Sequence, residues 1–195
     1  ETLFKSEQIP GETLVPGALI KVYIASVSEA KDMGRRGPRA TISRTHPGLV
    51  RRLLESEVPE IFDGTVEIKS VSREAGSRSK IAVYSADENV DPVGACIGQR
   101  GARVNKIVDQ LGGEKLDVVR YSENPAEFVA ASLAPADVIS VTVISEEEKT
   151  CKVVVPNSQL SLAIGNKGQN ARLAAKLTGW KIDINPESGF FEIKE

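Results

Sequence analysis

The chain has 195 residues, of which 41% are hydrophobic and 27% are charged, with a formal net charge of −2. This composition supports a hydrophobic core, excludes an intrinsically disordered chain and fits one or two domains. No apolar run approaches the roughly 18 residues that a membrane helix needs, and the opening ETLFKSEQ lacks the regions of a signal peptide. We therefore expect a cytoplasmic protein with no membrane partner. Because no initiator Met is present, we also expect a piece of a longer protein.

The sequence offers little support for metal or catalytic chemistry. Cys96 and Cys151 lack ligand spacing, and His46, the only histidine, precedes a proline. Walker, GxSxG and metal-ligand motifs are absent from the sequence, and one such histidine gives a catalytic triad little support. We expect buried free thiols, no metal, no cofactor and no catalytic residues.

The first half of the chain is expected to begin with strands and continue as a mixed helix and strand unit. In order, the pattern predicts a loop at 5–12, strands at 18–27 and 39–44, a helix at 46–57, and strands at 65–71 and 80–85. A short helix capped by Asp91 should follow, with Pro92 at its first position. The next helix should bury Val104, Ile107, Val108 and Leu111, stop at Gly112 and precede a strand at 115–119.

The second half repeats this order. It predicts a helix at 124–133 with Asn124 as its cap and Glu127 in a capping box, strands at 138–145 and 152–155, and a short helix capped by Ser158. A helix that buries Ala171, Ala174 and Ala175, together with Leu173 and Leu177, should end at Gly179, before a strand at 181–184. Phe190 and Phe191 are expected in a short packed strand.

An internal repeat supports this reading. The segment IGQRGARVNKIVDQLGG, from Ile97, aligns with IGNKGQNARLAAKLTGW, from Ile164. With 16 glycines, chance predicts roughly one GxxG spacing in the chain, yet there are three. The third, at 34–37, precedes Pro38 without a helical pattern, so we assign it to a loop.

The two repeated GxxG loops are candidate phosphate sites. A turn between helices needs one glycine at most, so the second needs another reason. Two residues without side chains let a phosphate approach backbone N–H groups at the start of the next helix, where the helix dipole is positive. A cation lies between the glycines each time. The windows 92–108 and 149–182 contain no acidic residue, so two local basic zones are expected in an acidic chain.

At these residues the sequence resembles the KH family, whose GXXG loop clamps single-stranded nucleic acid. Four segments, EVPEIFDGTVEIKSVSREAGSRSKIAV, DPVGACIGQRG, GEKLDVV and QLSLAIGNKGQNARLAAKLTGW, are also similar to a family of bacterial transcription elongation, termination and antitermination factors. The resemblance implies an α+β chain with two tandem type II KH domains, at 46–121 and 122–195. It implies that 1–45 is the C-terminal part of an all-β OB-fold barrel of the ribosomal-protein type.

The resemblance also implies a set of RNA-binding residues. The clamps would be Gly98, Gln99, Arg100 and Gly101, and Gly165, Asn166, Lys167 and Gly168, with Ile97 and Ile164 beside the bases. From the residues alone, both isoleucines could equally be core. Side chains that could reach RNA are Arg103, Gln169, Asn170 and Arg172, although each could equally be a solvated helix residue. Aromatic residues make up 5% of the chain and none lies in either loop, so we expect aliphatic base contacts rather than stacking.

The implied partner is nascent single-stranded RNA, with one strand running across both KH domains of a monomeric chain. RNA polymerase would be a partner of the full-length protein, through a domain absent here. Two alternatives remain open: a KH and OB scaffold that acts mainly as a protein interaction module, and an RNA-binding appendage of an RNA-processing enzyme.

Overall fold

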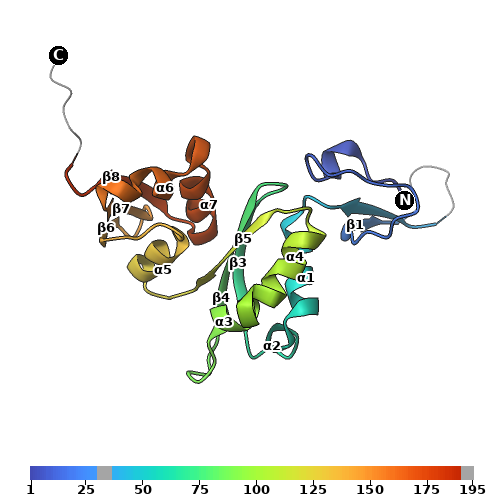
Figure 1. The fold of residues 1–195 in the computed structure, drawn as a ribbon, viewed down its shortest axis with the longest axis horizontal. Helices are drawn as coiled ribbons and strands as arrows, with labels where there is room; N and C mark the ends of the chain where they lie inside the picture. Colours follow the sequence, from blue (N-terminus) through green and yellow to red (C-terminus); the bar gives the residue numbers. More distant parts are fainter. Residues whose placement is uncertain (30–36, 190–195) are drawn as a thin grey trace, which may run out of the picture.

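The computed structural model describes residues 1–29 and 37–189. Most of the expected loop at 34–37 and the expected strand at Phe190 and Phe191 lie outside the described residues. Two units of the same topology follow a short amino-terminal sheet (Figure 1).

The amino-terminal segment is only partly a sheet. Strands β1 (Tyr23–Ser28) and β2 (Arg39–Ser43) pair antiparallel, after a 3-10 turn, η1 (Lys5–Glu7). The strand expected at 18–27 therefore starts later than predicted, because β2 provides partners only from Tyr23 onward. The loop expected at 5–12 contains η1, which the sequence pattern did not predict.

The first unit places helices on one face of a three-stranded sheet. Its elements are α1 (Pro47–Glu57), α2 (Pro59–Phe62), β3 (Glu67–Glu74), β4 (Arg78–Tyr84), α3 (Pro92–Ile97), η3 (Gln99–Gly101), α4 (Ala102–Gln110) and β5 (Lys115–Arg120). The sheet order is β3-β4-β5, with the first pair antiparallel and the second parallel. The buried core includes Leu53, Leu54, Ile81, Ile107 and Leu111. As predicted, Asp91 caps α3 by accepting a hydrogen bond from the Val93 N–H.

The second unit repeats this topology. Its elements are α5 (Pro125–Ser132), β6 (Ser140–Ser145), β7 (Thr150–Val155), η4 (Asn157–Gln159), α6 (Leu160–Ile164), η5 (Asn166–Gly168), α7 (Gln169–Thr178) and β8 (Lys181–Pro186). Its sheet order, β6-β7-β8, has the same sequence of antiparallel and parallel pairs. The repeat read from the sequence is thus a repeat of topology.

One predicted cap and one predicted capping box of the second unit are wrong. Ser158 lies inside the turn η4, and α6 begins after Gln159 without a side-chain cap. Asn124 caps α5 as predicted, but the Glu127 carboxylate does not accept the Asn124 N–H. Instead that N–H donates to the Ser122 hydroxyl, which in turn donates to Glu127 at 2.7 Å. The Ser122 hydroxyl therefore bridges the two groups that a capping box would join directly.

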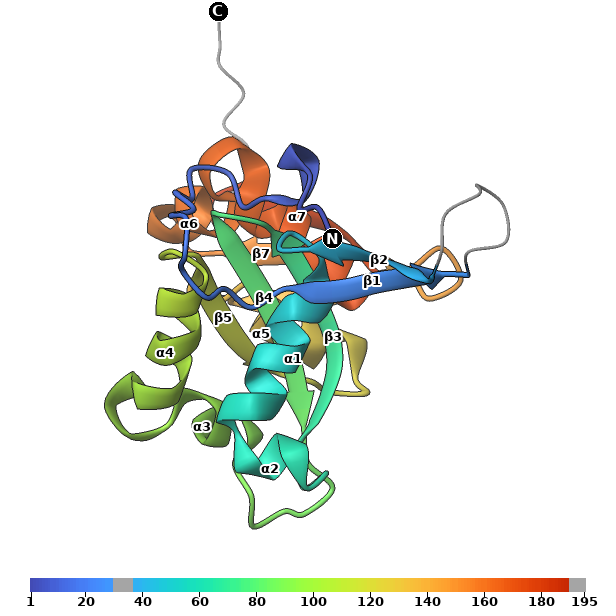
Figure 2. The same ribbon diagram turned by 90° about the vertical axis from the view of Figure 1, so that its right-hand side faces the viewer.

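The second unit packs against the face of the first sheet that α1 and α4 leave uncovered (Figures 1 and 2). Ala82 and Val119, from β4 and β5, form a buried cluster with Phe128 of α5 and Leu177 of α7. The Ser72 hydroxyl of β3 also donates to a carbonyl of α7, that of Leu173, at 2.8 Å. The two units are therefore packed together.

Candidate nucleic-acid interface

The two loops, 98–101 and 165–168, have nearly the same backbone. In each, the cationic residue is left-handed: Arg100 has φ 51° and ψ 30°, and Lys167 has φ 52° and ψ 30°. A residue with a side chain pays roughly 1 kcal/mol or more for this conformation. Both side chains are exposed, and neither forms an ion pair with any residue in the described part of the chain. The repeat thus carries two free cations on identically strained turns.

The first glycine of each loop permits a close approach between helices. A Cβ on Gly98 would lie 2.8 Å from Cγ of Arg103, and one on Gly165 would lie 2.7 Å from the backbone nitrogen of Asn170. Both glycines have positive φ and a ψ near 170°, a combination essentially restricted to glycine. This glycine therefore closes the short helix onto the first turn of the next one.

The second glycine has a different role. Gly101 and Gly168 have φ of 76° and 73° and stand immediately before α4 and α7. A Cβ on Gly168 would meet nothing within 4 Å, and one on Gly101 would meet only the Asn105 side chain. The N–H groups of Gly101 and Gly168 already donate to the carbonyls of Gly98 and Gly165. The space in front of both helix starts is open, and the positive end of the helix dipole there favours an anion.

An apolar residue borders each loop. Ile97 and Ile164 end α3 and α6, and 37% of each is exposed. Of the two readings that the sequence left open, a fully buried core position does not fit this exposure. Each loop therefore has a cation on it and an accessible aliphatic side chain beside it.

The four other predicted site residues are engaged with protein groups. Arg103 donates to the Glu60 carboxylate at 2.8 Å and to the Ala95 carbonyl at 2.7 Å. Asn170 donates from Nδ2 to the carbonyls of Leu133 and Ala163, each at 3.0 Å. Positions 103 and 170 correspond in the repeat, and both tie the second helix of the pair back to the first.

The other two side chains, Gln169 and Arg172, reach across to the first unit. Both hold the carboxylate of Glu74, at 2.7 Å and 2.5 Å. The bond from Arg172, followed by that from Gln169, lowers the pKa of Glu74. Lys106 also pairs with Glu57. In the described part of the chain, acids from other elements therefore pair with two of the three cations of the first expected basic zone, but with only Arg172 among the six of the second. A count of charges within one sequence segment misses the acidic residues that folding brings next to it from other segments.

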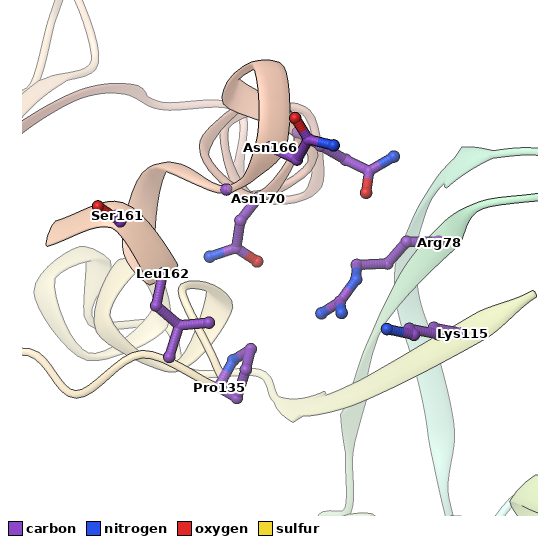
Figure 3. A pocket seen from close by; sticks show the side chains of 9 residues that line it. Arg78, Lys115, Pro135, Ser161, Leu162, Asn166 and Asn170 are labelled. Atoms are coloured by element: carbon purple, nitrogen blue, oxygen red, sulfur yellow. The ribbon is translucent and has the colours of Figure 1, made fainter. Parts of the chain in front are cut away.

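Sequence reasoning missed two cations beside the second loop. Arg78 and Lys115 start the paired strands β4 and β5. Together with Asn166 and Asn170 they line a cleft between the units (Figure 3). No local signal marks them, because only the packing of the second unit places them opposite its loop.

Metal-ligating side chains do not gather in the described residues. Residues 1–29 and 37–189 contain no group of three His, Cys, Asp or Glu side chains that could hold a metal ion. Both cysteines are buried free thiols, as predicted, and burial raises the pKa of Cys96 to about 12. Within the same ranges, no helix has the length and apolarity to cross a membrane.

Comparison of the sequence with known protein families identifies relatives of this chain. The profile of a NusA-like first KH domain matches residues 44–121, and that of a NusA-like second KH domain matches 125–192. The chain belongs to the NusA family. The NusA protein of Halalkalibacterium halodurans, named a transcription termination/antitermination protein, is 60% identical over 183 residues, covering 94% of this chain and 47% of that protein. The protein of the same name from Bacillus subtilis is 57% identical over 188 residues, covering 96% and 49%. The chain thus spans about half the length of the curated NusA relatives it matches.

The predicted fold class is confirmed. The chain is α+β, with two tandem NusA-type KH domains preceded by an OB-like sheet. The crystal structure of APE1850 superposes with a TM-score of 0.52 at 23% identity, covering 71% of this chain and 97% of that one. That likeness concerns the fold alone.

Proposed function

We propose that this chain binds single-stranded RNA through both GxxG loops. The observation that carries the proposal is the repeated loop: a free cation in left-handed backbone, then a glycine with open space before a helix start. Anions favour such helix starts, and phosphate is the anion of an RNA backbone. Ile97 and Ile164 lie on the side where bases would contact aliphatic groups.

Within each clamp, the residues divide into seats and supports. The two phosphate seats are the GxxG loops themselves: Gly98, Gln99, Arg100 and Gly101 in the first domain, and Gly165, Asn166, Lys167 and Gly168 in the second. The seats are held in place by the hydrogen bonds described above, which come from Arg103, Gln169, Asn170 and Arg172. We assign no catalytic step and no cofactor to these residues.

In the whole protein, this binding serves transcription. Relatives are named transcription termination/antitermination protein, and their chains are about twice as long as this one. We propose that the two KH domains capture nascent RNA in a cytoplasmic bacterial factor that regulates elongation, pausing, termination and antitermination. RNA polymerase would then be a partner of the full-length protein.

The test compares a charged with a neutral substitution of the same shape. Gly101→Asp and Gly168→Asp place a carboxylate where a phosphate should lie, whereas Gly101→Asn and Gly168→Asn keep the size and the tolerance for left-handed backbone. Fluorescence anisotropy with a labelled single-stranded RNA of about 12 nucleotides, enough for two loops of about four nucleotides each, gives the affinity.

We expect the Asp double variant to lose at least tenfold more affinity than the Asn double variant, with both folded by circular dichroism. Equal affinities of the two double variants would contradict the phosphate seats. Failure of the unmodified chain to bind any RNA would favour a protein interaction scaffold, and cleavage of the RNA in the presence of magnesium would favour an enzyme appendage.

A further inference from the structure

The cleft between the two units holds an unsatisfied acceptor next to two cations. It has a volume of about 340 Å³ and is lined by Arg78 and Lys115 of the first unit and by Ser161, Asn166 and Asn170 of the second. Figure 3 shows the side chains of Arg78 and Lys115 extending from the first sheet toward Asn170 and Pro135 of the second unit. The cleft therefore lies between the start of strands β4 and β5 in the first domain and the proposed phosphate seat of the second domain.

The acceptor is the amide oxygen of Asn170. This residue is 4% exposed, and its Oδ1 has no hydrogen-bond partner among residues 1–29 and 37–189. The orientation of the amide is fixed by its own contacts, since Nδ2 donates to two carbonyls and the oxygen could not. In Figure 3 the oxygen points toward the cleft and Arg78. A buried acceptor without a partner is destabilising, so a donor that enters the cleft is favoured.

The charge of the cleft wall favours an anion. Arg78 pairs with Asp117 at 2.9 Å, but Asp117 also accepts from the buried Lys80 at 2.9 Å. One carboxylate is thus shared by two cations. Lys115 is exposed and forms no ion pair with the described residues. The cluster of Arg78, Lys80, Asp117 and Lys115 therefore carries a net positive charge.

We propose that this cleft is a third RNA subsite, which reads the backbone of the nucleotide linking the two KH domains. Arg78 and Lys115 hold its phosphate, and Asn170 Oδ1 accepts a hydrogen bond from its ribose 2′-hydroxyl. The 2′-hydroxyl is the donor that every RNA nucleotide carries whatever its base, and that DNA lacks. The proposal rests on the proposed function, because it needs one strand to engage both loops.

The first test removes the cations. We compare the double variant Arg78→Gln/Lys115→Gln with the control Arg120→Gln, which lies at the opposite end of β5. Each is tested with an RNA of about 12 nucleotides and with one of about five nucleotides, which fits a single loop. We expect the double variant to lose roughly tenfold affinity for the longer RNA, with a log–log salt slope shallower by about 0.7 per lost phosphate contact. The affinity for the shorter RNA and the melting temperature should match those of the control.

The second test alters the RNA and leaves the protein intact. A series of longer RNAs, each with a single 2′-deoxy nucleotide, should show a several-fold loss at one interior position. That loss should disappear in Asn170→Leu, whose folding is checked by its melting temperature. An unmodified chain that binds the longer RNA, with affinity and salt slope unchanged in the double variant, would overturn the phosphate site. A flat deoxy series would overturn the role of Asn170. No binding by the unmodified chain would overturn the proposed function itself.

Discussion

The glycines of one loop are not equivalent residues. Gly165 has a backbone conformation open essentially to glycine alone and lies against the backbone of Asn170, whereas Gly168 has free space around its Cα. The first glycine belongs to the packing of two helices, and the second to the surface that faces solvent.

This difference predicts unequal stability effects. Gly165→Ala should lower the free energy of unfolding by about 2–4 kcal/mol, because it adds steric overlap to backbone strain. Gly168→Ala adds only strain and should cost about 1 kcal/mol. Urea unfolding of both variants measures the difference, and equal losses would contradict the separate roles.

Cys96 shows how burial controls a single thiol. Because its pKa is raised to about 12 in the folded chain, the unfolded chain loses this proton first as the pH rises. The contribution of Cys96 to the free energy of unfolding is therefore complete below pH about 9 and falls between about 9 and 12.

Across that pH range, we expect the free energy of unfolding to fall more steeply for the unmodified chain than for Cys96→Ala. Thiol reagents should modify Cys96 only as fast as the chain opens. Parallel pH profiles, or rapid modification of Cys96 in the folded chain, would contradict this account.

At the scale of elements, a buried ion pair fixes the sheet of the first unit. Arg73 and Glu114 have fully buried side chains, and Glu114 also accepts from the Gly76 N–H and the Ser79 hydroxyl. These contacts join the turn between β3 and β4 to the residue that precedes β5. Glu74, the last residue of β3, accepts hydrogen bonds from Gln169 and Arg172 of α7 in the second unit.

Glu114→Gln should therefore destabilise the chain by about 3 kcal/mol, because it leaves Arg73 buried without a counter-charge. Glu123→Gln, at an exposed position, is the matched control and should have little effect. Thermal unfolding gives both values. A loss for Glu114→Gln no larger than that of the control would show that the pair does not hold the sheet.

The elements themselves were largely predictable, because periodicity and glycines are local signals. The helices around Ile107 and Leu173 and the turns at Gly98 and Gly165 follow directly from them. The cap at Ser158 was wrong because Pro156 and a 3-10 turn precede α6. The cleft beside Arg78 was not predictable, since it depends on contacts between residues far apart in sequence.

At the scale of the whole molecule, the packing of the two units sets the path between the loops. Ala82 is fully buried in the contact with Phe128 and Leu177, on the sheet face that points away from α1 and α4. A charge at this position should separate the units while leaving the core of each unit intact.

We therefore expect Ala82→Glu to increase the radius of gyration in small-angle X-ray scattering, and Ala82→Ser to leave it unchanged. Because the loops then lose their fixed spacing, the affinity for a 12-nucleotide RNA should fall toward that for an RNA of about five nucleotides. A compact Ala82→Glu variant with full affinity would contradict the importance of this contact.

The most direct test of the central claim is a titration followed residue by residue. In ¹⁵N NMR spectra, the amide signals of Arg100, Gly101, Lys167 and Gly168 should shift together as a 12-nucleotide RNA is added, and saturate at one RNA per chain. Shifts in one loop only, or shifts confined to surfaces away from both loops, would contradict two phosphate seats acting on one strand.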